Sequence, residues 1–594
     1  MTTLHYQITP SNLNSHLFSV QLSFTSQADK SYTLSLPAWL PGSYMIRDFA
    51  KNITEISAIN GKDQPITLNK LDKQTWQLIA TDKTITLNYQ VFAFDLSVRT
   101  AYLDNQRGFF NGSSTFLQVA ELDNSPCTLI INSPHPVNNW RVATGLTRSN
   151  VTDKYSFGEY IAENYNELID CPVAIGDFDS IEFSVEGVIH HLVFTSQHFG
   201  DREQLKDDIK KLCQHHINLF GGAPFKEYWF ITHLLENGFG GLEHKNSTIL
   251  QASRFDLPNP NRINERSDNY KKFLSLCSHE YFHAWNVCRI KPKEFTPYNL
   301  QEEVYTNQLW AYEGITSYYD DFSLYRTGLI NFDEYLKILA QTATRVYRGK
   351  GELKQTVAES SFDTWTKFYQ QGPDAVNNIV SYYTKGSLIA LWLDLTIREK
   401  SQGQFSLDTL MRELWLHFGQ TGIGTQEDDF INIANSLCNE DITENFKKLL
   451  HSPARIDLSS LLTTVGINFT YQKFEKLNEL ITTQADNYQG YLGAQYQDSP
   501  LGVKIKSVVE DSPAANAGIA VNDVLIAVHH TKASVKSLQA LADHLPQNSH
   551  VSCHYFRDDQ LLISEIQFID SPLSGVGFTV ENQEKNKLWQ KIIS

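Results

Sequence analysis

The sequence has no long apolar run and no regular spacing of cysteines. The longest apolar candidate, Leu388 to Ile397, contains Asp394 and falls short of the roughly 18 consecutive apolar residues that cross a membrane. The start of the chain has no basic segment followed by an apolar run, so we expect no secretory signal. Seven cysteines without a C-x-x-C pair favour reduced core thiols over a disulfide framework or a thiolate metal site. We therefore expect a cytoplasmic protein without a membrane partner.

Basic residues are also in the minority. The chain of 594 residues contains 50 lysines and arginines against 67 aspartates and glutamates, which gives a net charge of -17. This charge argues against nucleic acid and anionic membranes as partners. The 41% of hydrophobic and 20% of charged residues are ordinary for a globular protein, and the length predicts three or four domains.

Strict alternation of apolar residues marks the first part of the chain as β structure. It runs from Phe18 to Phe24, from Tyr32 to Leu36 and from Ile85 to Val91, and it predicts a sandwich-like sheet domain over residues 1–172. The segment Leu36–Tyr44 is too rich in proline and aromatic residues for a plain strand. It is either a loop that reaches a neighbouring domain or a packed surface corner.

The pattern then changes to helical spacing. Apolar residues recur at helical intervals from Leu205 to Leu219, Gly221 ends that pattern, and a strand is expected at Tyr228–Leu235. We assign residues 173–460 to a mainly helical domain and 461–486 to a connecting region. Residues 487–570 read as small strands with one helix, Val535–Leu545, and 571–594 as a polar helical tail. The fold class is multidomain α+β.

One pentapeptide, His279-Glu280-Tyr281-Phe282-His283, carries metal-binding chemistry. On a helix from about Asp268 to Val287, His279 and His283 lie four residues apart on one face, so their imidazoles can bind one metal ion. Zinc is the usual metal at such a site, and Glu280 can reach a water on it. With 19 histidines in the chain, a chance match has a probability of roughly a few per cent.

A hydrolytic zinc site also needs a third protein ligand. Glu313 lies in the stretch Leu309–Asp320, which has helical periodicity and little charge around the glutamate. On spacing alone, a zinc ligand and an ion-paired surface residue fit Glu313 equally well. The adjacent histidine pairs have no second ligand at useful spacing and are expected to be ordinary core or surface residues: His190-His191, His215-His216 and His529-His530.

A glycine-rich segment, Gly240-Gly241-Leu242-Glu243-His244, precedes the pentapeptide on an expected strand edge. Glycines there let a substrate backbone pair in β fashion. An acidic residue at the end of such a groove can hold a free α-ammonium group. Taken alone, a glycine turn followed by a solvated carboxylate is the simpler explanation. For His244 we expect a structural or supporting role.

A tyrosine follows the pentapeptide at the start of a predicted helix, in Ser381-Tyr382-Tyr383-Thr384-Lys385-Gly386. A hydroxyl at such a helix start can donate to the oxyanion of a tetrahedral intermediate. Neighbouring Tyr382 offers the same chemistry, and most tyrosines are packing residues.

Together and in this order, G-G-L-E-H, H-E-x-x-H, W-x-x-E-G and Y-T-K-G resemble one family, the PDZ-containing glycyl aminopeptidases among the gluzincin zinc metallopeptidases, distant relatives of aminopeptidase N. Family-like sequences at residues 36–44, 240–248 and 279–287 extend the resemblance over nearly the whole chain. It implies a thermolysin-like, mainly helical zinc peptidase domain between the β domain and a C-terminal PDZ domain.

The resemblance also implies a ligand set. One Zn²⁺ per chain would be held by His279, His283 and Glu313, and Glu280 would be the general base that activates the zinc-bound water. The spacer to Glu313 is longer than in aminopeptidase N.

The remaining site residues follow from the same resemblance. Tyr383 would stabilise the oxyanion, Gly240 and Gly241 would lie along the substrate, and Glu243 would hold its free amino terminus. His244 stands where aminopeptidase N has asparagine, a departure that affects recognition of the amine or carbonyl and leaves the metal chemistry untouched.

The C-terminal segment has a motif of its own. Gly490-Tyr491-Leu492-Gly493-Ala494 resembles the carboxylate-binding loop of a PDZ domain, with Tyr491 to Ala494 as peptide-binding residues. Asn522 stands where a glycine is common, a position compatible with positive φ. The domain either binds a peptide C-terminus or a regulatory partner, or only packs against the catalytic domain.

The leading hypothesis is a zinc aminopeptidase acting on peptide substrates. Its preference for N-terminal glycine or alanine comes from the resemblance. One alternative is a zinc endopeptidase in which Glu243 is structural. Another is a catalytically inert PDZ peptide-binding protein, which has no chemical need for all five residues His279, Glu280, His283, Glu313 and Tyr383.

Overall fold

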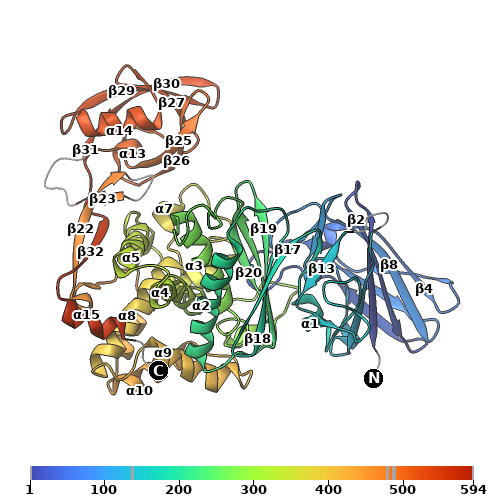
Figure 1. Cartoon of the computed structure of the whole chain (residues 1–594). Coiled ribbons are helices and arrows are strands. Elements are labelled where there is room, and N and C mark those ends of the chain that lie inside the picture. Colours follow the sequence, from blue (N-terminus) through green and yellow to red (C-terminus); the bar gives the residue numbers. More distant parts are fainter. Residues whose placement is uncertain (1–2, 135–138, 477–480, 484–489, 592–594) are drawn as a thin grey trace. The chain divides into compact units, whose positions relative to one another are not determined.

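Figure 1 shows the computed structural model of the chain, which describes residues 3–134, 139–476, 481–483 and 490–591. Its internal contacts divide the chain into two units, one of Met1–Val304 with Trp415–Gly424 and one of Tyr305–Leu414 with Thr425–Ser594. Parts of the predicted connecting region (461–486) and of the predicted tail (571–594) lie outside the described residues. The predicted start of the PDZ domain at residue 487 does so too.

The first unit begins with the predicted β domain. Strand β2 (Leu17–Thr25) buries Phe18, Val20, Leu22 and Phe24 in turn. Strand β8 (Thr84–Phe92) alternates in the same way along its length. Successive side chains of a strand point to opposite faces, so each strand contributes one apolar face to the core. The β-rich domain that the alternation predicts is confirmed.

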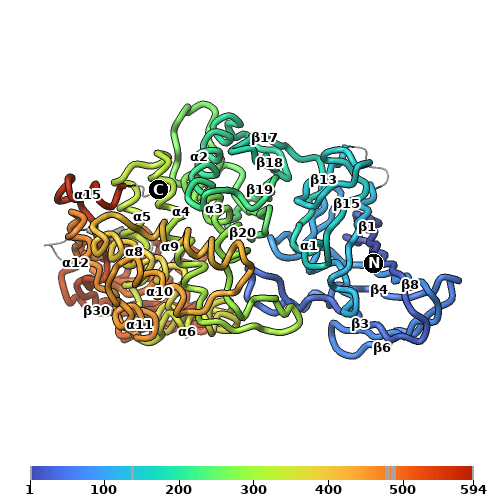
Figure 2. Tube along the Cα trace, turned by 90° about the horizontal axis from the view of Figure 1, so that it is seen from below, coloured from blue at the N-terminus to red at the C-terminus, as the bar shows by residue number. Residues whose placement is uncertain are grey.

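Three sheets build this domain, which is the blue to cyan part of the tube in Figure 2. The largest sheet has, in order, β14 (Thr147–Arg148), β15 (Gly158–Ala162), β12 (Cys127–Ile131), β1 (Leu4–Asn12), β2, β8, β4 (Ile53–Asn60) and β5 (Pro65–Ile66). The second has β13 (Arg141–Thr144), β16 (Val173–Gly176), β10 (Arg107–Phe110) and β9 (Ala101–Leu103). The third has β11 (Gln118–Val119), β3 (Ser31–Ser35), β7 (Thr75–Ile79) and β6 (Asn69–Lys70). Because β16 pairs with β10, the β domain extends past the predicted boundary at residue 172.

A five-stranded sheet follows in the same unit. Its order is β17 (Asp179–Val185), β18 (Val188–Phe194), β19 (Glu227–Leu235), β21 (Ser247–Ser253) and β20 (Phe239–Glu243). Helices α2 (Arg202–Phe220) and α3 (Asp268–Phe282) pack against each other and against this sheet (Figure 1). The predicted stop of α2 is confirmed, since Gly221 caps it with φ 76° in the left-handed region.

The β domain and the five-stranded sheet share one apolar core. The buried cluster of the β domain also includes five residues of the five-stranded sheet: Val193, Trp229, Ile231, Leu242 and Ile249. A short helix, α1 (Tyr165–Ile169), precedes β16 at the end of the β domain.

The proline- and aromatic-rich segment Leu36–Tyr44 leaves β3 and docks on the segment that follows the pentapeptide helix. The indole Nε1 of Trp39 donates to the carbonyl oxygens of Asn299 (2.9 Å) and Glu302 (2.8 Å). The ring of Tyr44 stacks on Phe295 with centroids 5.7 Å apart. Of the two interpretations left open by the sequence, the structure supports the loop that reaches a neighbouring part of the chain.

The second unit is helical where it begins. A single π-helical turn, η5 (Trp310–Gly314), leads into α4 (Ile315–Arg326). The further helices are α5 (Phe332–Tyr347), α6 (Val357–Phe362), α7 (Ala375–Asn378), α8 (Thr384–Lys400), α9 (Leu407–Leu414), α10 (Glu427–Cys438), α11 (Thr443–His451) and α12 (Ser459–Thr464). The helix predicted to open near Tyr383 is therefore α8.

Two glycines let η5 and α8 touch through their backbones. A Cβ on Gly314 would lie 2.5 Å from the Cα of Gly386 and 2.9 Å from the carbonyl oxygen of Tyr382. A Cβ on Gly386 would lie 2.8 Å from the Cα of Gly314. Real Cβ atoms do not approach other atoms so closely, so both glycines are required by the crossing.

The PDZ domain is built from strands and two helices. These are β24 (Gly490–Tyr491), β25 (Ala494–Ser499), β26 (Gly502–Val508), α13 (Pro513–Asn516), β27 (Val524–Val528), β28 (Thr531–Lys532), α14 (Val535–His544), β29 (His550–Arg557), β30 (Gln560–Gln567) and β31 (Ile569–Asp570). The predicted helix at Val535 is α14, and Asn522 adopts the positive φ (75°) that the sequence suggested.

The chain on either side of the PDZ domain pairs with itself. Strand β22 (Ile467–Lys476) runs antiparallel to β32 (Gly575–Val580), and β23 (Ile481–Thr483) pairs with the end of β22. Helix α15 (Gln583–Gln590) then returns to the helices of the unit. Trp589 is fully buried there and donates to the hydroxyl of Tyr318 (3.3 Å).

The cysteines are as the sequence predicts. All seven are free thiols and six are buried. Burial raises the pKa of Cys213 and Cys277 well above the usual thiol value, which keeps them protonated. No helix among the described residues combines the length and the apolar character of a membrane span.

Histidine 233 on β19 makes the first unit sensitive to acid. Its ring is fully buried, meets the ring of Phe109 edge-on and hydrogen bonds to Thr195 (3.1 Å). Burial, helped by the positive charge of Arg107, lowers the pKa of His233 to about 3 from its ordinary 6.5. In the folded protein the ring therefore stays neutral at pH values where the unfolded chain binds a proton.

The stability contributed by this neutral ring is fully present above pH 6.5 and is lost as the pH falls towards 3. Between neutral pH and pH 5 we expect His233 alone to lower the free energy of unfolding by about 2 kcal/mol. The His233→Gln variant should lose that part of the decline, while the exposed control His550→Gln should keep it. Urea unfolding at both pH values measures the difference, and an equal decline in all three proteins would contradict the prediction.

The crossing of η5 and α8 gives a second prediction. Gly386→Ala should lower the free energy of unfolding by about 1–3 kcal/mol, because the added methyl group forces the two helices apart. This loss should exceed the gain of about 1 kcal/mol that alanine brings to a helix. Gly61→Ala is the control, since its nearest neighbour would lie at an ordinary 3.4 Å. Equal thermal midpoints for the two variants would show that the crossing tolerates a side chain.

Candidate active site

The pentapeptide lies at the end of α3. The helix stops at Phe282, five residues before the predicted end at Val287, because the following turn tightens and Val287 itself has φ 97°. His283 caps the helix with helical φ −60° and ψ −20°, so it stays on the same face as His279. The two imidazole rings have centroids 4.6 Å apart.

The orientation of His283 is fixed by the turn after α3. Its Nδ1 lies 2.8 Å from the carbonyl oxygen of Asn286. With the proton on Nδ1 this contact is a hydrogen bond, and Nε2 remains for a metal. The next residue, Val287, has a positive φ of 97°, which is strained for a β-branched residue. Nothing in the local sequence indicates these supporting roles.

The opposite face of α3 is held by two buried histidines. His190 on β18 lies 2.8 Å from the hydroxyl of Tyr281, and His216 on α2 lies 2.9 Å from the hydroxyl of Ser278. Burial lowers the pKa of His190 to about 4, so its neutral ring can accept from Tyr281. Both are core histidines, as the sequence predicts for the adjacent pairs, and they fix the helix that carries the pentapeptide.

Glu313 is positioned by η5. A π-helical turn inserts one extra residue per turn and often marks a functional position. Glu313 is 2% exposed and directly precedes Gly314 at the crossing with α8. The carboxylate is thus buried, which the sequence alone left undecided.

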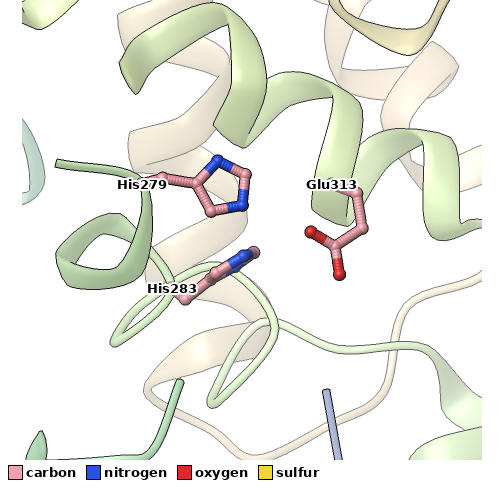
Figure 3. Close-up of side chains that lie close together, drawn as sticks. All are labelled: His279, His283 and Glu313. Atoms are coloured by element: carbon pink, nitrogen blue, oxygen red, sulfur yellow. The ribbon is translucent and has the colours of Figure 1, made fainter. Parts of the chain in front are cut away.

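Three candidate ligands converge. One ligand atom each of His279, His283 and Glu313 lies within 4.8 Å of the others, and Figure 3 shows both rings and the carboxylate pointing towards one another. Within the part of the chain that the structure describes, no other such group of three is found. Two imidazole nitrogens and one carboxylate oxygen are the donor set of mononuclear hydrolytic zinc sites. The residues therefore fit zinc.

Glu280 lies against the edge strand of the sheet. Its side chain is 5% exposed, and its carboxylate occupies the place where a Cβ of Gly241 would be. Any other residue at 241 would push Glu280 aside. Gly240 and Gly241 lie within β20 rather than in a turn, and β20 is the outermost strand of its sheet among the described strands.

Glu243 ends β20 and is buried. Its two carboxylate oxygens lie 2.5 Å from the place where a Cβ of Gly42 would be. Gly42 comes from the β domain, in the docked segment Leu36–Tyr44. The Pro41-Gly42 pair signals a turn, but nothing in the local sequence tells what that turn contacts.

His244 has a structural contact. Its Nδ1 lies 3.1 Å from Asp170, and the other Asp170 oxygen accepts from the backbone N–H of Lys245 (3.2 Å). Burial alone would raise the pKa of Asp170, but the hydrogen bonds and positive charges of His244 and Lys245 outweigh it and lower that pKa. The supporting role expected for His244 thus takes the form of an anchor to the β domain.

The two neighbouring tyrosines differ in their surroundings. Tyr382 is fully buried, its hydroxyl lies 2.9 Å from Thr364, and burial raises its pKa well above the usual value. Tyr383 is partly exposed at the start of α8 and stacks on Phe368 and Tyr382. Of the two, Tyr383 is the one with access to solvent.

The predicted PDZ loop lines a small hollow. Tyr491, Leu492, Gly493 and Ala494 line it together with Phe474 of β22 and residues of α14. Its volume of about 30 Å³ has room for water but not for a peptide side chain. Peptide binding at this loop stays a prediction.

Comparison with known families agrees with this arrangement. Residues 5–177 match the Peptidase M61 N-terminal domain, residues 272–389 match the M61 glycyl aminopeptidase model, and residues 490–567 match a PDZ domain. A search of curated proteins gave no match.

Solved structures include one similar over its whole length. A crystal structure described as an aminopeptidase N family protein from Idiomarina loihiensis is 42% identical, covers 99% of this chain and 100% of its own, and superposes with a TM-score of 0.96. An M1 zinc metallopeptidase from Deinococcus radiodurans is 10% identical over 77% of this chain and 94% of its own, with a TM-score of 0.48. On the matches of both M61 domains and this whole-length similarity, the chain belongs to the M61 glycyl aminopeptidase family, with a C-terminal PDZ domain.

Proposed function

We propose that the protein is a zinc-dependent aminopeptidase that hydrolyses the first peptide bond of peptides with small N-terminal residues. The observation that carries the proposal is the order of contacts along β20. Gly241 lies under the carboxylate of Glu280, and Glu243 ends the same strand two residues later. The preference for glycine and alanine rests on the family, whose model is described as glycyl aminopeptidase.

His279, His283 and Glu313 would hold one zinc ion per chain. When bound there, zinc supplies a Lewis acid that polarises a carbonyl and lowers the pKa of a water molecule. His283 is oriented for this role by Asn286, and His279 by the packed helix α3.

The free edge of β20 sets the direction of the substrate. A peptide that adds to this edge in antiparallel fashion runs opposite to β20, so its amino terminus lies at the Glu243 end. Two residues of a strand span roughly 7 Å. Gly241, which lies beside Glu280, is therefore separated from Glu243 by about this length. One residue fits between the base and the site of the ammonium group.

Glu280 would move the proton. Its carboxylate accepts a proton from the attacking water and delivers it to the leaving amine. Gly241 lies against the carboxylate of Glu280 on one side. The hydroxyl of Tyr228 donates a hydrogen bond to the backbone oxygen of Glu280 (3.2 Å). Burial of Glu280 keeps bulk water from competing for the proton.

Tyr383 would donate its hydroxyl to the oxyanion, since Tyr382 is buried and engaged by Thr364. Glu243 would bind the α-ammonium group through a charge-assisted hydrogen bond. In an endopeptidase, Glu243 would have no role in substrate binding. In a catalytically inert binding protein, none of His279, Glu280, His283, Glu313 and Tyr383 would have a catalytic role. The PDZ domain would add a peptide-binding surface of its own.

The base assignment predicts a separation of metal binding from catalysis. Glu280→Gln keeps the size of the side chain but cannot accept the proton, so kcat should fall roughly 10²–10⁴-fold. Zinc content by elemental analysis should stay at one per chain. Comparable activity of the variant would exclude Glu280 as the base, whereas loss of zinc would make the comparison uninformative and call for Glu280→Asp.

The exopeptidase assignment predicts dependence on a free amino terminus. A panel of chromogenic aminoacyl amides should be hydrolysed only without a chelator, with glycine and alanine best, and their N-acetylated forms should resist. Glu243→Gln should lower kcat/KM on the free amines by about 10–100-fold and leave the acetylated forms unchanged. Equal hydrolysis of free and acetylated substrates would favour the endopeptidase.

A further inference from the structure

The β domain places a tight turn at the amino-terminal end of the proposed substrate site. Leu40-Pro41-Gly42-Ser43 closes with a hydrogen bond from the Ser43 N–H to the Leu40 carbonyl (3.2 Å). Proline in the second position and a third residue at φ 79° are the features of a type II turn. Gly42 is partly exposed at its tip.

The tip meets the carboxylate of Glu243. Both carboxylate oxygens lie 2.5 Å from the position that a Cβ on Gly42 would take. An ordinary contact there would need more than 3.4 Å, so a side chain at 42 and the present position of Glu243 exclude each other. The turn type and the contact thus require glycine for two independent reasons.

The turn is held rigidly. Ala38 donates to the carbonyl of Leu300 (2.7 Å), and Arg47 donates from its backbone to Ala38 (2.8 Å) and from its guanidinium to the hydroxyl of Ser43 (2.7 Å). Together with the anchor at Trp39, these bonds leave the turn little freedom to retreat from Glu243.

The β domain also holds the residues after Glu243. Asp170 binds His244 and the backbone of Lys245, and the carbonyl of Gly145 accepts from the side chain of Asn246 (2.9 Å). The β domain therefore contacts Glu243 and each of the three residues that connect β20 to β21. A β domain that only packed beside the sheet would not need a contact with each of these four residues.

We infer that Gly42 is a specificity-determining residue, through which the β domain closes the amino-terminal end of the substrate site. This inference rests on the proposed aminopeptidase function. Without a side chain, Gly42 lets the Glu243 carboxylate sit where the end of an antiparallel substrate strand arrives. The turn also stands in the path of any residue that would precede the first one, so it limits the site to substrates that begin there.

A double-mutant cycle tests the coupling between Gly42 and Glu243. Gly42→Ala should displace the carboxylate and lower kcat/KM on alanine p-nitroanilide at least about tenfold, mainly by raising KM. In a Glu243→Ala background the three atoms nearest to the added methyl group are gone, so adding Gly42→Ala should change kcat/KM by less than about twofold. Glu243→Asp, shorter by one methylene, should likewise tolerate Gly42→Ala.

Backbone strain needs its own control. Gly187 has nearly the same φ (80°) in the hairpin between β17 and β18, and a Cβ there would meet nothing within 4 Å. Gly187→Ala therefore carries the strain without the contact and should keep wild-type KM. Zinc content and thermal midpoints of all variants show whether each is folded.

The outcomes separate cleanly. Equal losses from Gly42→Ala in the wild-type and Glu243→Ala backgrounds, or a loss no greater than that of Gly187→Ala, would overturn the inference. Either result leaves the proposed function standing if the wild type still prefers free amines to acetylated ones. If the wild type shows no such preference, the proposed function fails instead, whatever the cycle gives.

Discussion

Close approach between backbone and side chain at a few glycines is the constraint on which this site depends. A buried carboxylate is costly unless its surroundings fix it, and here the missing side chains of Gly241 and Gly42 make room for Glu280 and Glu243. The missing side chains of Gly314 and Gly386 likewise let two helical segments pack closely. Their contact brings the turn that carries Glu313 against the start of α8. Four positions without a Cβ thus set where three carboxylates and a tyrosine can lie.

The sequence predicts what depends on local spacing. Alternation located β2 and β8, and helical intervals located α2 and α14, because each pattern reflects one buried face of one element. The spacing of His279 and His283 could be interpreted locally, because residues four apart on a helix share a face, whereas Glu313 was assigned from the family resemblance, since its spacing alone left its role open. The end of α3 was misplaced because Val287 adopts φ 97°, a conformation that a β-branched residue rarely takes and that the sequence pattern does not indicate.

Contacts between distant segments were beyond local reasoning. Gly42 and Asp170 belong to the β domain, and no periodicity near them indicates Glu243 or His244 as neighbours. The two tyrosines could not be separated either, because only packing buries Tyr382 against Thr364 and leaves Tyr383 partly exposed. The supporting histidines His190 and His216 were expected to be ordinary, and they are, yet they brace the helix on which the metal ligands lie.

The pairing of β22 with β32 determines how the PDZ domain is attached to the rest of the chain. Because both strands enter the same ladder, this domain is an insertion with two attachment points rather than a bead on a single flexible tether. The polypeptide therefore leaves for this domain and returns from it through neighbouring strands of one ladder. The return of the chain through α15, with Trp589 in the helical core, makes that ladder part of the folded body.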